Sequence, residues 1–295
     1  MMEERSREWM CRREEACYPE KLKVYKSMPR VLYVRGGLPD PEKPAVAVVG
    51  ARACSRYGEQ QAYRFGKILS ENGVQIISGL ARGIDGMAHR GALDAGGKTF
   101  AVMGCGTDIC YPAEHRELYD RMKDGQGGIL SEFPGKTPPY GKNFPRRNRI
   151  ISALADLVLV IEARKRSGSL ITASYALEQG KTVYALPGRV GDAVSEGCNL
   201  LIADGAGIAC SPEMLLEELG ISCERKVNFR QNSKIRLASH EEMVYSCLDF
   251  QPKNIEEIHQ ETDLNTRIIA EVLLKLELDG LITEPAKNYY ARAGG

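Results

Sequence analysis

The chain has 295 residues, of which 43% are hydrophobic and 27% charged, a composition typical of a globular protein with a sizeable core. It contains no run of the roughly 18–20 apolar residues that a membrane-spanning helix needs, and its charged N-terminal segment is unlike a secretory signal, so we expect a cytoplasmic protein without membrane contact. The net charge of +1 combines −6 over residues 239–295 with about +7 over the preceding residues, and such a basic larger part suits a polyanionic partner.

Apolar, β-branched runs recur from residue 46, and each is followed by a polar or glycine-rich turn and a helical pattern. Strands are predicted at 46–49, 74–77, 99–103, 128–130, 157–161, 182–186 and 207–209. Helices are predicted at 58–71, 84–95, 113–123, 146–155, 169–179 and 211–219. Short buried strands that alternate with helices predict an α/β fold with a mostly parallel, doubly wound sheet over residues 45–220, preceded by a lead-in segment at residues 1–44.

The C-terminal part of the chain has a different pattern. Residues 221–238 are polar and basic without clear periodicity, and we interpret them as a linker. Residues 239–295 contain three helical segments and a hairpin pattern, which predicts a small winged-helix domain. Such domains usually bind duplex DNA through the second helix of the turn. Here that helix carries Arg267 and Lys275 against three acidic residues, which favours a protein-contacting or regulatory role.

The strand ends lack the fingerprint of a nucleotide cofactor. The first turn, residues 50–58, is GARACSRYG and not GxGxxG, and the second strand ends in Ser78-Gly79, without the acidic residue that binds a ribose. The P-loop pattern GxxxxGK[ST] is also missing from the sequence. We therefore expect no cofactor.

The nine cysteines show no metal-binding spacing. No CxxC pair occurs, and the closest pairs are Cys105/Cys110 and Cys11/Cys17. Dispersed cysteines in a cytosolic chain predict reduced thiols and no metal site.

Two loops at strand ends have the composition of anion sites. Glycine backbones, serine hydroxyls and a helix start can together hold phosphate oxygens. For either loop alone, N-caps and tight turns are the favoured explanation. Together with nearby cations they favour phosphate binding, through Gly79, Arg82 and Gly83 in SGLARGIDG, and Ser167, Gly168 and Ser169 in RSGSLITA.

The stretch KNFPRRNRII at residues 142–151 places four cations, Lys142, Arg146, Arg147 and Arg149, at the start of a predicted helix. The positive end of a helix dipole disfavours cations, so an anion is expected nearby, although a solvated surface is an alternative. Phe144 lies among the cations, and a ring between basic side chains suits single-stranded nucleic acid. Arg52, after the first strand, should lie at the same edge of the sheet.

Two residue pairs are weighed as catalytic groups. Asp85 and His89 are four residues apart on one helix face, but we favour a carboxylate at the positive helix end and a packed histidine. Glu132 and Glu162 follow strands and could work as paired carboxylates, but we favour structural ion pairs with arginines such as Arg149. No confident catalytic constellation results.

Six segments together resemble a known family. They read VAVVGARACSRYG, SGLARGIDGMAH, GCGTDICYP, SEFPGKTPPYGKNFPRRNRIISALAD, EARKRSGSLITASYALEQGKTVYALPG and GCNLLIADGA, in this order over roughly residues 45–207. The chain resembles the DNA-processing protein A (DprA/Smf) family. Residues 18–36 also look like the family's lead-in segment, and a helical domain that precedes it in many members is expected to be missing.

The resemblance implies an extended Rossmann-like domain that binds single-stranded DNA and forms a homodimer. It implies a non-enzymatic recombination mediator that protects incoming DNA and loads the RecA recombinase onto strands coated by single-strand-binding protein, as in natural transformation. It also implies DNA contacts by Arg52, where the family's usual GSR is Gly50-Ala51-Arg52 here, and by Lys142, Phe144, Arg146 and Arg147. The alternatives are a nucleotide phosphoribohydrolase, whose PGGxGT run is missing, and a winged-helix transcription regulator.

Overall fold

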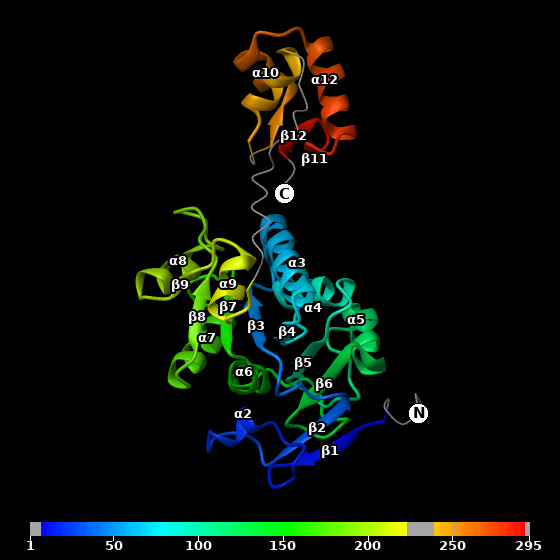
Figure 1. Ribbon diagram of the computed structural model, residues 1–295, viewed down its shortest axis with the longest axis vertical. Helices are drawn as coiled ribbons and strands as arrows, with labels where there is room; N and C mark the ends of the chain where they lie inside the picture. Colours follow the sequence, from blue (N-terminus) through cyan, green and yellow to red (C-terminus); the bar gives the residue numbers. More distant parts are fainter. Residues whose placement is uncertain (1–6, 223–238, 250–251, 293–295) are drawn as a thin grey trace. The chain divides into compact units, whose positions relative to one another are not determined.

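The computed structural model describes residues 7–222, 239–249 and 252–292 (Figure 1). The chain divides into two compact units, Met1–Arg225 and Lys226–Gly295, and each unit is described by itself. Most of the expected linker, residues 223–238, lies outside the described residues. Within the described part of the chain, no helix combines the length and the apolar character needed to cross a membrane.

The first unit is built on a nine-stranded sheet with the order β1-β2-β6-β5-β4-β3-β7-β8-β9. Strands β3 to β9 are parallel, whereas β1 pairs antiparallel with β2 and β2 antiparallel with β6. The strand bounds are β1 Trp9–Arg12, β2 Val31–Gly36, β3 Ala45–Gly50, β4 Gln75–Ser78, β5 Thr99–Met103, β6 Gly127–Ser131, β7 Leu157–Ile161, β8 Thr182–Ala185 and β9 Gly207–Ile208.

Strand β3 shows how the sheet is buried on both faces. Successive side chains of a strand point to opposite faces, and accordingly Ala47 and Val49 join one hydrophobic cluster while Val46 and Val48 join another. Continuous apolar strands such as β7, all of whose residues are buried, are typical of parallel sheets covered on both sides. The predicted doubly wound α/β fold is confirmed.

Helices cover both faces of the sheet (Figure 1). Helices α3, α4 and α9 contribute to the cluster that contains Val46, and α6 and α7 to the cluster that contains Ala47. The bounds are α2 Glu20–Lys23, α3 Arg56–Glu71, α4 Ile84–Asp94, η1 Ala113–His115, α5 Arg116–Arg121, η2 Met122–Gln126, α6 Asn143–Leu154, α7 Gly168–Glu178, α8 Glu196–Ala203 and α9 Pro212–Glu218.

The N-terminal residues belong to the same sheet, although the sequence separated residues 1–44 as a lead-in segment. Strand β2 pairs with β6, and β1 forms the edge beyond it. Lys21 forms an ion pair with Asp156 at 2.7 Å, and the same carboxylate accepts a hydrogen bond from the Ala45 N–H at 2.8 Å. Residue 44 therefore marks no boundary between compact units.

One pair of cysteines differs from the expectation. Cys11 and Cys17 form a disulfide with Cα atoms 6.4 Å apart, where the sequence predicted reduced thiols. The turn after β1 brings them together, because the Glu15 N–H donates to the Arg12 carbonyl and closes the turn. Among the described residues, Cys11, Glu15 and Cys17 are close enough together to hold a metal ion, but both sulfur atoms are used in the disulfide.

The second unit has the predicted winged-helix arrangement of three helices and a hairpin. Its small sheet has the order β10-β12-β11. On the second helix of the turn, Arg267 pairs with Glu271, and Lys275 pairs with Glu241, so both cations already have carboxylate partners. The bounds are α10 Ser239–Cys247, β10 Lys253–Asn254, α11 Ile255–Thr262, α12 Thr266–Leu278, β11 Ile282–Ala286 and β12 Tyr289–Arg292.

Candidate nucleic-acid interface

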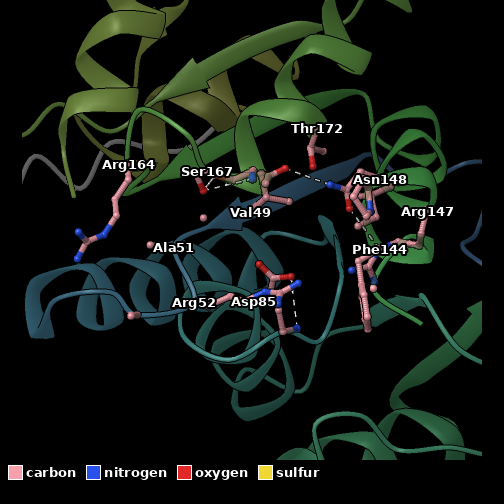
Figure 2. Close-up of a pocket in the computed structure, with 18 of the residues that line it drawn as sticks. Val49, Ala51, Arg52, Asp85, Phe144, Arg147, Asn148, Arg164, Ser167 and Thr172 are labelled. Atoms are coloured by element: carbon pink, nitrogen blue, oxygen red, sulfur yellow. Dashed lines mark hydrogen bonds between the residues drawn. The ribbon is translucent and has the colours of Figure 1, made fainter. Parts of the chain in front are cut away.

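A cleft opens at the carboxyl ends of the parallel strands, where the strand order reverses. Strands β4 to β6 lie on one side of β3 and strands β7 to β9 on the other, and ligands of doubly wound sheets bind at such a point. The cleft has a volume of about 620 Å³ and lies between the end of β3, the start of α6 and the loop before α7 (Figure 2). Its charged and aromatic lining includes Arg52, Tyr111, Phe144, Arg147, Arg164 and Arg166.

Phe144 is the centre of an aromatic and cationic cluster in this cleft. The guanidinium carbon of Arg52 lies 5.4 Å from the centre of the Phe144 ring, and that of Arg147 lies 6.0 Å from it. The ring of Tyr111 is 5.5 Å from the Phe144 ring, centre to centre, and is tilted by 39°. Cations attracted to the ring hold it in place, while the partly exposed ring still lines the cleft.

The start of α6 carries four cations, and a carboxylate inside the protein balances two of them. The side chain of Glu132 is 2% exposed, and its Oε2 accepts from Arg146 at 2.9 Å and from Arg149 at 2.8 Å. The interpretation of Glu132 as an ion-pair partner of Arg149 is confirmed. Arg149 is buried, whereas Arg146 is 61% exposed and Lys142 is exposed at the N-cap of the helix.

Arg147 points into the protein. The residue is 3% exposed, and its Nη1 donates to the carbonyl oxygen of Gly79 at 3.0 Å and to that of Val102. Burial lowers the pKa of Arg147 to about 10, against the attraction of Asp85, so the group stays charged at neutral pH. The sequence predicted that Arg147 and Arg149 contact phosphates, but because α6 lies against the sheet, both side chains have partners inside the protein.

The first glycine-rich loop, residues 78–86, holds a carboxylate of its own. Asp85 accepts from the N–H groups of Gly79 at 3.0 Å and Ala81 at 3.4 Å, at the start of α4, where an anion is favoured. Burial raises the pKa of Asp85, and Arg147 opposes this. A Cβ on Gly79 would lie 2.6 Å from the Arg147 guanidinium. The sequence predicted an approach to phosphate at Gly79, whereas the residue makes room for Arg147.

A second cavity, of about 330 Å³, adjoins the cleft, and Arg52 lines both. Arg82 and Gly83 line this second cavity. Gly83 has a φ of +71°, and a Cβ there would lie 2.4 Å from the carbonyl oxygen of Ala51, so the glycine allows two loops to pack closely. Arg82 is 63% exposed and donates two hydrogen bonds to Glu114, at 2.8 and 2.7 Å.

The second loop opens into the cleft. Ser167 is the N-cap of α7 and accepts from the Ser169 N–H at 3.3 Å, and the two hydroxyl oxygens are 2.8 Å apart. Gly168 is exposed, and a Cβ on it would meet no atom within 4 Å. The serines therefore begin the helix, as the alternative interpretation held, and all three residues also line the cleft (Figure 2).

The residues weighed as catalytic groups have separate structural partners. His89 is buried with its Nδ1 2.6 Å from Thr99 Oγ1, and burial lowers its pKa to about 3, so it is neutral. The interpretation of Asp85 and His89 as a helix-start carboxylate and a packed histidine is confirmed. Glu162 accepts from the Ser55 N–H at 2.7 Å and from the Ser55 hydroxyl at the start of α3. Among the described residues, no arginine pairs with it, contrary to the favoured interpretation.

Several lining residues were not predicted from the sequence. Arg164 and Arg166 flank Lys165 in the run RKR, directly before the serine loop, so the same strand-end rule applied to charges would have found them. Tyr111, Asn148 and Thr172 have no local signal, because only the fold brings them to the cleft.

Comparisons with protein families agree with this architecture. Residues 9–220 match the family described as DNA recombination-mediator protein A. Residues 230–285 match the family described as DprA winged helix domain. The first match alone covers most of the chain.

Curated proteins from several bacteria are similar to this chain in sequence. Protein Smf of Escherichia coli (strain K12) is 48% identical over 68% of this chain and 54% of its own length, so the chain spans about half of that protein. DNA processing protein DprA of Streptococcus pneumoniae is 44% identical over 68% of this chain and 71% of its own length. Protein Smf of Synechocystis sp. is 32% identical over 93% of this chain and 78% of its own length.

Two solved structures are similar to the chain. The X-ray structure of DprA from Streptococcus pneumoniae has a TM-score of 0.67 and 40% identity, over 73% of this chain and 76% of that one. DNA processing protein A from Helicobacter pylori, described with its single-stranded DNA binding mode, has a TM-score of 0.64 and 28% identity, over 72% of this chain and 95% of that one. The chain therefore belongs to the DNA recombination-mediator protein A (DprA/Smf) family of DNA-processing proteins.

Proposed function

We propose that this protein binds single-stranded DNA in the cleft at the strand-order reversal and acts as a non-enzymatic recombination mediator. The observation that carries the proposal is the cleft lining, in which exposed Arg52, Arg164 and Arg166 lie around the partly exposed ring of Phe144. Basic side chains neutralise a phosphate backbone, and an aromatic ring stacks with a base that a single strand leaves free. The described binding mode of the Helicobacter pylori relative supports this proposal.

The predicted binding residues fall into two groups by exposure. We assign direct contact with DNA to exposed or cleft-lining residues, which are Arg52, Arg82, Lys142, Phe144, Arg146, Ser167, Gly168 and Ser169. We assign positioning roles to residues with partners inside the protein. Arg147 holds the ring of Phe144 and the Gly79 loop, Arg149 fixes α6 on Glu132, and Gly83 shapes the loop beside Arg52.

A role in binding rather than catalysis is supported by the surroundings of the acidic residues. Asp85 accepts hydrogen bonds from backbone N–H groups and is attracted by Arg147. Glu132 pairs with two arginines, and Glu162 accepts from Ser55. A general acid or base needs a free position toward its substrate, whereas Asp85, although it lines the cleft, already accepts two backbone hydrogen bonds, and Glu132 and Glu162 are buried. We therefore favour binding over the phosphoribohydrolase reaction.

A salt titration on single-stranded and duplex oligonucleotides tests the proposal. We expect tighter binding of oligo-dT than of duplex, and an affinity that falls steeply with salt because released counterions drive binding. Arg52→Ala or Lys142→Ala should weaken binding by about 1–3 kcal/mol, whatever the base sequence. Lys67→Ala, which removes a cation from α3 outside both cavities, is the control. Parental affinity in the Arg52/Lys142 double variant would refute this site.

We further propose, from membership of the family, that the protein works as a cytoplasmic homodimer. In this proposal it protects incoming DNA in natural transformation and loads the RecA recombinase onto strands coated by single-strand-binding protein. The test is RecA filament formation on coated strands, with the Arg52→Ala variant as the comparison. If the parent and the variant stimulate RecA filament formation equally, loading does not depend on DNA binding in this cleft.

A further inference from the structure

The second cavity continues the cleft across a shared wall. Arg52 lines both spaces, and Tyr111 lines the cleft beside Phe144. Tyr111 is 43% exposed, so its ring offers free surface that Phe144 does not cover. A hydrogen bond from Arg82 to Glu114 raises the pKa of Arg82, and the charge of Tyr111 contributes in the same direction. Tyr111 therefore adds a second exposed ring to the cleft, beside Phe144, and the cations of the adjoining cavity lie beyond the shared residue Arg52.

The arginines of the second cavity could bind a phosphate, but carboxylates of the protein occupy part of their hydrogen-bonding capacity. Arg52, Arg82 and Arg90 line it together with Glu59 and Glu114. Arg90 is 3.7 Å from Glu117, and Glu114 binds Arg82 through both oxygens. Both pairs are exposed to solvent, and exposed ion pairs are weak. A phosphate can therefore replace Glu114 on the Arg82 fork, which matches phosphate as well as carboxylate.

We propose that the second cavity is a phosphate subsite that extends the cleft by one nucleotide of a single strand: the base stacks on Tyr111 in the cleft, and the adjoining phosphate binds Arg82 and Arg90 in the second cavity after Glu114 has released Arg82. The inference rests on the proposed function, because the strand reaches this subsite from the cleft. The ligand is one nucleotide unit of a polymer.

Glu114 makes this subsite selective for a polymer. Glu114 competes with any phosphate for Arg82. Because Glu114 and Arg82 belong to one folded chain, the effective concentration of the Glu114 carboxylate at Arg82 is high. A free phosphate or mononucleotide competes poorly against it. A phosphate tethered to nucleotides already held at Phe144 also has a high effective concentration, so only a strand bound in the cleft displaces Glu114.

Tyr111 variants test the stacking contact, with oligo-dT of increasing length and the full chain. Tyr111→Leu should lower affinity about tenfold, within the range of one stacked base, and should abolish the gain from the nucleotide that reaches the subsite. The slope of affinity against salt should not change, because no charge is lost. Tyr111→Phe should bind like the parent. Tyr140→Leu removes a nearby exposed ring that lines neither cavity and is the matched control.

Charge variants test the phosphate contact. Glu114→Gln should bind oligo-dT more tightly, by about threefold, because it removes a weak exposed competitor. Arg82→Ala and Arg90→Ala should each weaken binding and reduce the salt slope by about 0.7, the change for one phosphate contact of a single strand. Lys67→Ala should leave the affinity and the slope unchanged. A circular dichroism melt for each variant separates lost binding from lost folding.

The outcomes distinguish this subsite from the proposed function. If the parent binds oligo-dT while Tyr111→Leu, Arg90→Ala and Glu114→Gln all bind like the parent, the subsite is refuted and the cleft at Phe144 stands. If Tyr111→Leu changes the salt slope as Arg90→Ala does, stacking is refuted. A parent that ignores oligo-dT at low salt removes both proposals.

Discussion

Two loops at the same edge of the sheet share a glycine- and serine-rich composition but relate to anions in opposite ways. In residues 78–86 the backbone N–H groups bind Asp85 of the same loop. In residues 166–169 Ser167 begins a helix, and Gly168 faces open space in the cleft. A glycine-rich helix start therefore predicts where an anion is favoured, but not whether the anion comes from the protein or from a ligand.

Because one loop binds a carboxylate of the protein and the other faces open space, the two loops should contribute differently to stability and binding. The first loop holds the carboxylate of Asp85 and the guanidinium of Arg147, which are almost fully buried and attract each other. Removing one of two such charges is costly, because it leaves the other without compensation. The second loop encloses no such pair among its described contacts. We therefore expect substitutions in the first loop to change stability and substitutions in the second to change binding.

The largest expected effect is that of Asp85→Ala. It leaves Arg147 buried without its carboxylate and should cost about 3–5 kcal/mol of unfolding free energy. Urea unfolding followed by the fluorescence of Trp9, the single tryptophan and a residue of the larger unit, measures the change. Asp204→Ala, at an exposed helix end, should cost less than about 0.5 kcal/mol. Equal midpoints for both variants would contradict the account of the first loop.

Acid should destabilise the folded protein through His89, which lies in helix α4. His89 titrates at about pKa 3 in the folded protein against 6.5 in its ordinary state. Between these values the unfolded chain binds more protons, so stability is full above pH 6.5 and falls by up to about 1.4 kcal/mol per pH unit below it. The loss should be about 2 kcal/mol at pH 5.

The variant His89→Asn isolates this term. Its amide can still donate toward Thr99 Oγ1, which itself donates to the Ile76 carbonyl, but it does not titrate in this range. Urea midpoints of parent and variant should diverge between pH 7 and pH 5, with the flatter profile in the variant. Parallel profiles would mean that His89 takes up a proton in the folded state as easily as in the unfolded chain.

Alanine at the two glycines contrasts the loops directly. In Gly79→Ala the new methyl group meets the Arg147 guanidinium, and we expect a loss of about 1–3 kcal/mol. In Gly168→Ala the methyl group meets no protein atom, so stability should rise or stay the same, by no more than about 1 kcal/mol. Oligo-dT binding should nevertheless weaken, because the methyl group blocks a strand at the loop backbone. Unchanged binding by Gly168→Ala would place the strand elsewhere.

Ser167→Ala should destabilise the protein less than Asp85→Ala does. Loss of the N-cap hydroxyl of α7 should cost about 1 kcal/mol, measured by the same urea unfolding. Ser174→Ala, which removes an exposed hydroxyl bonded to Leu170 on the same helix, is the control. A cost as large as that of Asp85→Ala would erase the contrast between the two loops.

The features that the sequence predicted correctly are those that short stretches of neighbouring residues determine. Apolar β-branched runs with polar ends indicated the central strands and the binding edge, because both features are written in a few adjacent residues. Helix α6 begins at Asn143, earlier than predicted, since proline is tolerated in a first turn, where its missing N–H has no role. Helix α8 and the short edge strand β1 have no clear periodicity and were not predicted.

The orientation of side chains depended on packing and not on the local sequence. Arg146 and Arg147 are neighbours of the same type, yet one is exposed and the other is enclosed by the sheet. Only the position of α6 on the sheet decides between them. The same holds for Tyr111, which comes from a loop with no binding signal and meets Phe144 through the fold.

The reversal of strand order has a consequence for the growing chain. Arg52 leaves the ribosome with β3, but Phe144 and the loop before α7 follow only after β4, β5 and β6 have been made. A nascent chain that ends near β6 therefore carries Arg52 and Tyr111 but lacks Phe144 and the loop before α7. The complete cleft, with Phe144 and the serine loop, therefore forms only when the segment through α7 has been made.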